Sequence, residues 1–205
     1  MKRTTLAMAA LAVLAFASLA LAACGGSDDN GGSNDQDQIT QAITAAATSG
    51  DPATCTKYQT LKFTEQTTGA QGQAAIQSCQ KDATNTAADT IDVTDIQVDG
   101  DNATAKGKAT GSIFDGQTLK VALVKEDGQW KLDDFQGFEN LNKDAMAAAF
   151  TQQLKAEGDP PQAIDCLTKQ FQSASDDVIE GTFVDSDTQA EQQLFGPCAK
   201  YFKQG

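Results

Sequence analysis

The sequence predicts an α+β protein in which helices come first, an antiparallel sheet follows, and more helices end the chain. Between residues 39 and 88, apolar residues recur at the three- and four-residue spacing of helices. From Ile91 the spacing changes to two, the period of a half-buried strand, and turn sequences such as Asp-Gly-Asp-Asn at 99–102 separate the alternating runs. After residue 141 the helical spacing returns. Helices and strands that are segregated in this way are typical of α+β folds rather than α/β folds.

The first 23 residues have the layout of a secretory signal peptide. Lys2 and Arg3 precede an uncharged run rich in Ala and Leu, and small residues come before Cys24. The uncharged run of 18 residues borders on the length of a membrane-spanning helix, so a retained helical anchor is the alternative. Because the run is mostly weakly apolar Ala and ends without a basic cluster, we expect cleavage after residue 23.

The sequence Leu-Ala-Ala-Cys at 21–24 resembles the lipobox of bacterial lipoproteins. The resemblance implies that Cys24 becomes the mature N-terminus, carries diacylglycerol through a thioether, and anchors the protein on the extracytoplasmic face of the cell membrane. Residues 25–38 contain no apolar side chain and cannot bury enough surface to offset the entropy of ordering. The segment 24–38 is therefore predicted to be the lipidated cysteine and a flexible acidic tether.

The charge and composition exclude several functions. The 205-residue chain has a net charge of −13, and its only Arg, Arg3, lies in the signal peptide together with Lys2. A chain this acidic lacks the basic surface that nucleic-acid phosphates require. It also contains no His, so neither a Ser-His-Asp triad nor a Cys-His pair can be assembled. We therefore expect a protein that is not an enzyme and that holds no metal or cofactor.

The five cysteines are consistent with lipidation at Cys24. Setting that residue aside leaves an even number of thiols in an oxidising compartment, which three different pairings could join. We favour Cys55–Cys79 and Cys166–Cys198, because each pair then lies within one predicted domain. Four buried free thiols are the alternative.

The first domain is predicted to span residues 39–140. Three helices precede the sheet, one from Ile39, a short one opened by Pro52, and one at about 71–88. Three or four strands follow in runs that alternate or carry small residues on one face, at 91–98, 103–111, 119–123 and 130–135. The first run changes phase near Thr94-Asp95, which indicates a β-bulge.

Helices followed by a meander that ends in Asp-Gly-Gln-Trp-Lys-Leu at 127–132 resemble the nuclear transport factor 2-like fold, in the versions found in actinobacterial lipoproteins. The resemblance covers about half of the chain and implies a curved sheet that wraps around helices to form a cone with a pocket. Its relatives include isomerases and cyclases that use a pocket Asp or a His-Asp pair, as well as many proteins that are not enzymes.

Trp130, Asp133 and Asp134 are the candidates for lining such a pocket, and Glu139 lies nearby. A pocket carboxylate with a raised pKa would indicate proton abstraction, whereas the alternative is that these carboxylates are solvated at the end of a strand. Trp130 could form the floor of a pocket or fill the core. The small residues at 103–111 could leave open space in the cone or let a helix pack closely.

Residues 141–205 are predicted to form a small helical domain. Apolar residues recur at helical spacing in stripes that include Met146, Phe150, Leu167, Phe171 and Leu194. A core of this size is thin, so the Cys166–Cys198 disulfide would matter for its stability. The segment resembles helical modules appended to actinobacterial lipoproteins, which implies no activity.

Together these features predict a lipid-anchored, non-catalytic cell-envelope protein that binds a small apolar ligand or an envelope protein. The alternatives are an isomerase- or cyclase-like enzyme that uses a pocket carboxylate, and a purely structural surface lipoprotein.

Overall fold

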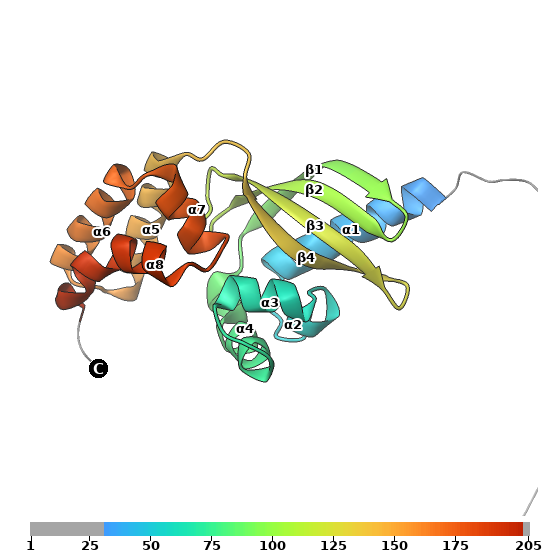
Figure 1. The fold of residues 1–205 in the computed structure, drawn as a ribbon, viewed down its shortest axis with the longest axis horizontal. Helices are drawn as coiled ribbons and strands as arrows, with labels where there is room; N and C mark the ends of the chain where they lie inside the picture. The colour runs from blue at the N-terminus through green and yellow to red at the C-terminus, as the bar shows by residue number, and fades with distance from the viewer. Residues whose placement is uncertain (1–30, 203–205) are drawn as a thin grey trace, which may run out of the picture.

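The computed structural model describes residues 31–202, without the side chains of residues 31–33 and 86 (Figure 1). The described chain forms an α+β fold, as predicted. The signal peptide, Cys24 and residues 25–30 lie outside the described residues. The elements in order are α1 (Gly31–Thr48), α2 (Thr54–Lys57), α3 (Leu61–Thr68), α4 (Gln73–Thr86), β1 (Thr90–Asp99), β2 (Asn102–Thr110), β3 (Thr118–Glu126), β4 (Gln129–Phe138), α5 (Lys143–Glu157), α6 (Pro161–Ser173), α7 (Asp176–Phe183), α8 (Thr188–Phe195) and the 3-10 helix η1 (Gly196–Tyr201).

The four strands form one antiparallel meander in the order β1-β2-β3-β4. The predicted bulge in β1 is confirmed, because the register with β2 shifts between Thr94 and Gln97. Asp95 within this bulge has a φ of 53°, a left-handed conformation that Asp adopts more readily than most residues. Two further register shifts interrupt the pairing of β3 with β4. Bulges of this kind bend a strand and increase its twist.

Helix α1 packs against one face of the sheet (Figure 1). Along β2 this face consists of small buried residues, Ala103, Ala105, Gly107 and Ala109. A Cβ atom at Gly107 would lie 2.8 Å from Cδ1 of Ile91 and 4.0 Å from Cγ2 of Ile43 in α1. Of the two explanations that the sequence left open, open space does not account for this face, because its small residues are buried against side chains of the neighbouring strand β1 and of α1.

Helix α1 begins earlier than the predicted domain boundary at Ile39, so residues 31–38 are helical rather than part of a flexible tether. The contacts of Asp35 explain the difference. Its Oδ1 atom accepts hydrogen bonds from Lys125 Nζ at 2.7 Å and from Trp130 Nε1 at 3.0 Å. These two partners lie about ninety residues after Asp35 in the chain. The polar composition of residues 31–38 therefore does not reveal these contacts.

Both predicted disulfides are present. Cys55–Cys79 joins α2 to α4, and Cys166–Cys198 joins α6 to η1. Their sequence separations of 24 and 32 residues correspond to about 3–4 kcal/mol of stabilisation each in the chain-entropy model.

The C-terminal helices share a hydrophobic core with the sheet. Seven of the ten phenylalanines form a continuous series of ring contacts with centroids 4.7–6.4 Å apart. Phe135 and Phe138 of β4 contact Phe114, which contacts Phe183 of α7. Phe183 in turn contacts Phe171 of α6. The series therefore crosses the predicted boundary at residue 140, whereas a second, smaller cluster lies within the C-terminal helices alone.

Candidate functional site

Trp130 lies in the core rather than at the floor of an open pocket. Trp130 is 1% exposed and belongs to the main hydrophobic cluster. The indole Nε1–H donates to Asp35, and Lys125 Nζ lies 5.5 Å from the ring centroid while also bonding that carboxylate. The three side chains tie the start of α1 to the β3–β4 hairpin. This arrangement gives Trp130 a structural role in positioning α1.

The pairing of Asp35 makes stability depend on pH in the acid range. The hydrogen bond from Lys125, followed by that from Trp130, lowers the pKa of Asp35 below its ordinary value of 3.8. A lowered folded-state pKa means that the stabilisation is complete above the ordinary value and is lost as pH falls through the lowered one. In Asp35→Asn, the free energy of unfolding should therefore fall less steeply below pH 4 than in the parent chain. Urea titrations at several pH values measure the slope, and Asp37→Asn, at an exposed site on the same helix, is the control. Parallel slopes for the parent and Asp35→Asn would contradict the assignment.

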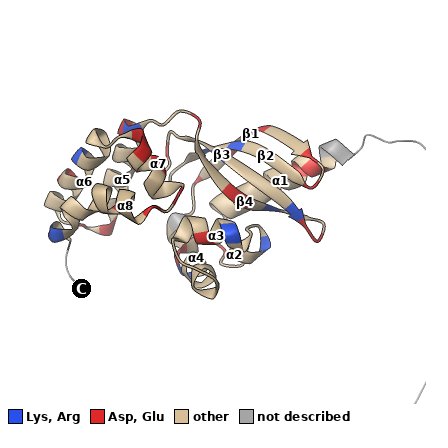
Figure 2. Ribbon diagram, in the orientation of Figure 1, with Lys and Arg blue, Asp and Glu red and all other residues tan. Residues whose placement is uncertain are grey.

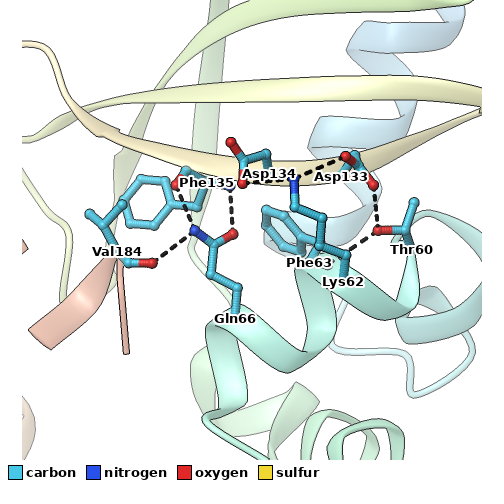
Figure 3. A network of polar contacts seen from close by, with 8 residues as sticks. All are labelled: Thr60, Lys62, Phe63, Gln66, Asp133, Asp134, Phe135 and Val184. Atoms are coloured by element: carbon cyan, nitrogen blue, oxygen red, sulfur yellow. Dashed lines mark hydrogen bonds and ion pairs between the residues drawn. The ribbon is translucent and has the colours of Figure 1, made fainter. Parts of the chain in front are cut away.

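Of the predicted pocket carboxylates, Asp133 and Asp134 are half-buried and pair with a lysine. Asp133 accepts a hydrogen bond from Thr60 Oγ1 at 3.0 Å, and Lys62 Nζ lies 3.3 Å from Asp133 Oδ2 and 3.1 Å from Asp134 Oδ1 (Figure 3). Glu139 pairs with Lys106. The pKa of Lys106 is raised to about 12 by Asp95 and Glu139. The structure thus brings Asp133 and Asp134 together around one lysine and keeps Trp130 away from them in the core.

Gln66 in α3 holds three parts of the chain together (Figure 3). Its Nε2 donates to the carbonyl oxygens of Phe135 and Val184, both at 2.8 Å, and its Oε1 accepts from the backbone N–H of Phe135 at 2.8 Å. The side-chain amide therefore pairs with β4 as a neighbouring strand would. Residues 58–60 cover the same edge, since Thr60 N–H donates to the Leu132 carbonyl at 2.8 Å.

Replacing Gln66 should destabilise the fold. Gln66→Leu keeps a similar volume but leaves both backbone groups of the buried Phe135 without this partner, which should cost about 1–3 kcal/mol. The free energy of unfolding from urea titration measures the effect. Gln73→Ala, at an exposed position in α4, is the matched control and should change stability by less than about 0.5 kcal/mol. Equal effects of the two substitutions would contradict the role of Gln66.

The interface between α1 and the sheet is filled by side chains. Ile39, Ile43, Leu123 and Trp130 are each 0–3% exposed and belong to one cluster. A filled interface of this kind offers an apolar ligand no space between these elements unless the core rearranges.

An open polar groove of about 600 Å³ lies where the ends of β2 and β3 meet the C-terminal helices. Its lining includes Lys108, Thr118, Asn142, Lys143 and Gln172. Lys143 is held by the Ala174 carbonyl at 2.8 Å and by Asp176 at 3.1 Å. The Lys108 side chain has no hydrogen bond or ion pair with any described residue and projects at an exposed position.

Gln117, which is fully buried, holds the lining residue Asn142 in place. Its Nε2 donates to the Asn142 carbonyl at 2.8 Å, and its Oε1 accepts from the Asn142 N–H at 2.9 Å. Asn142 also caps α5 by accepting from the N–H of Ala145. One side chain therefore fixes the start of α5 against the loop before β3, so that the shape of the groove is set by buried contacts.

No family model matches the sequence, and neither the curated proteins nor the solved structures contain a match to it. Within residues 31–202, no helix has the length and apolar character needed to cross a bilayer. The same residues contain no cluster of three or more Cys, Asp or Glu side chains arranged to hold a metal ion.

Sequence reasoning missed Gln66, Gln117 and Asp35 as organising residues. Each makes its contacts with residues that lie at least 25 positions away in the chain. Glutamine and aspartate are common at positions that the sequence pattern predicts to be exposed. Nothing in the local spacing of apolar residues distinguishes these three from the others.

Proposed function

We propose that this chain is a lipid-anchored, non-catalytic protein of the cell envelope, attached at Cys24 to the extracytoplasmic face of the cell membrane. The Leu-Ala-Ala-Cys sequence after a basic and then apolar N-terminus supports the proposal. The two disulfides support it as well, because such bonds persist in oxidising compartments outside the cytoplasm.

We further propose that residues 39–140 form a nuclear transport factor 2-like domain of the kind found in actinobacterial lipoproteins, with a helical module at 141–205. The order of helices α1–α4 before a four-stranded antiparallel meander supports this assignment, as does the packing of α1 on one face of the sheet. The fold alone does not determine what such a domain does.

The function that the geometry supports best is binding of an envelope protein at the groove between the sheet and the C-terminal helices. The observation that carries it is the contrast between the filled α1–sheet interface and the open groove of about 600 Å³. The groove lining offers amide, hydroxyl, ammonium and carboxylate groups to a polar partner surface. The carboxylates proposed for an enzyme are instead partly exposed and paired with lysines.

Native mass spectrometry of the mature chain, extracted from membranes in mild detergent, tests the binding mode. We expect the mass of the acylated chain without a retained apolar small molecule. A stoichiometric apolar ligand would contradict binding at the surface groove and would restore the pocket interpretation.

Crosslinking in intact cells tests the groove itself. A photoreactive side chain in place of Lys108 should crosslink to an envelope protein, whereas the same group in place of Lys81, which is exposed on α4, should not. Crosslinking that is equal at both positions would contradict a specific site at the groove.

A further inference from the structure

The position of the first helical turn restricts how the anchored molecule can sit above the membrane. Helix α1 starts at Gly31, and seven Cα–Cα steps separate this residue from Cys24. A chain of this length spans at most about 24 Å when fully extended. The start of α1 therefore cannot move farther than this from a lipid-linked Cys24.

The start of α1 is fixed to one end of the sheet. Asp35, one helical turn after Gly31, bonds Lys125 and Trp130 on either side of the β3–β4 turn. The β1–β2 turn lies at the same end of the meander, because the Lys125 N–H donates to the Asp101 carbonyl at 2.8 Å. Figure 1 shows the first turns of α1 beside the tips of both hairpins and the C-terminal helices at the opposite end.

We propose that the tips of the β1–β2 and β3–β4 hairpins face the membrane and that the groove and the C-terminal helices point away from it. This inference rests on the proposed lipid anchor at Cys24. Strand β2 runs from Asn102 at the tip to Thr110 near the groove, a rise of about 27 Å. The groove is therefore lifted above the bilayer by roughly the length of a strand, where an envelope partner can reach it.

The charge at the tips keeps this end from adhering to the bilayer. The two turns carry Asp99, Asp101, Glu126 and Asp127, all exposed, and Lys131 pairs with Glu126. Figure 2 shows acidic segments at the tips of both hairpins. An acidic end is repelled by an anionic leaflet, and at physiological ionic strength the repulsion acts within about 8–10 Å. The short stretch of chain between Cys24 and Gly31 thus holds the tips near the membrane, while the acidic charges keep them off its surface.

Energy transfer from the protein to lipid headgroups tests the orientation. In the acylated full chain every native cysteine is engaged, so an introduced cysteine gives a single labelling site. We compare a donor fluorophore at Asn102→Cys, at the tip, with one at Gln162→Cys, in the first turn of α6. With acceptor headgroups in phosphatidylcholine vesicles, transfer from position 102 should be severalfold stronger than from position 162. Equal or reversed transfer would overturn the proposal.

Two further variants separate the effect of the length of the chain between Cys24 and Gly31 from the effect of the acidic charge at the tips. Inserting about fourteen Gly and Ser residues after Gly26 triples the maximum distance between Cys24 and Gly31. Energy transfer from position 102 should then fall, and unchanged transfer would also overturn the proposal. The combined Asp99→Asn, Asp101→Asn and Asp127→Asn variant should increase transfer on vesicles that contain phosphatidylglycerol and not on phosphatidylcholine alone. An equal response on both would overturn the electrostatic part.

Flotation of the labelled protein with the vesicles distinguishes failure of the orientation from failure of the anchor. A chain that does not float with vesicles contradicts lipidation at Cys24, whereas a chain that floats but shows equal transfer from both positions contradicts the orientation alone.

Discussion

Trp130→Ala should lower the free energy of unfolding by about 3–5 kcal/mol, the range for truncating a large buried aromatic side chain. Trp130 is among the largest fully buried side chains of the described residues. Its loss removes packing against the core, opens a cavity beneath α1, and takes away one of the two hydrogen bonds that hold Asp35. Urea unfolding followed by far-ultraviolet circular dichroism measures the change.

Trp130→Phe separates packing from hydrogen bonding. The smaller ring retains much of the apolar volume but cannot donate to Asp35, so the loss should be smaller than in Trp130→Ala. A loss below about 1 kcal/mol in Trp130→Ala would mean that the residue lines open space rather than filling the core, because cavity formation would then cost little.

Phe171→Ala should cost a similar amount, about 3–5 kcal/mol, and should affect both halves of the chain. Phe171 is fully buried in α6, with its ring centroid 4.7 Å from that of Phe150 and 6.1 Å from that of Phe183. Phe183 continues the contacts to Phe114 and so to the sheet. Because Trp130 is the only tryptophan and lies in β4, its fluorescence reports on the sheet, while circular dichroism is dominated by the helices.

The two probes should therefore shift together in Phe171→Ala. Coincident transitions are the sign of one cooperative unit. Phe171→Leu, which keeps most of the apolar volume, should cost less than about 1.5 kcal/mol and serves as the control. A fluorescence transition that stays at the parent midpoint while the helical signal melts earlier would show that residues 141–205 unfold as a separate domain.

The predictions that held depend on local patterns in the sequence. The change of apolar period at Ile91 distinguishes helices from strands, and the phase change near Asp95 locates the bulge. The pairing of Cys55 with Cys79 follows from their place within one predicted domain. For the period and the bulge, a few adjacent residues carry the physical preference, so the sequence is informative about them without knowledge of the tertiary structure.

The features that could not be predicted depend on contacts between distant segments. The helical conformation of residues 31–38 is held by Asp35, whose partners lie in the β3–β4 hairpin. The shared core arises because Phe114, in the loop between β2 and β3, contacts Phe183 of α7. The candidate groove likewise forms only when Gln117 brings the start of α5 to the sheet. The spacing of apolar residues within one segment contains no information about its contacts with distant segments.

Lipidation at Cys24 is the central claim, and metabolic labelling with an alkyne-bearing fatty acid tests it most directly. The parent chain, expressed in a bacterium with lipoprotein-processing enzymes, should incorporate the probe, and Cys24→Ala should lose it completely. Cys55→Ala, which removes a cysteine that is paired in the fold, controls for thiol labelling elsewhere and should still incorporate the probe. Equal labelling of the parent chain and Cys24→Ala, or no labelling of either, would contradict the account.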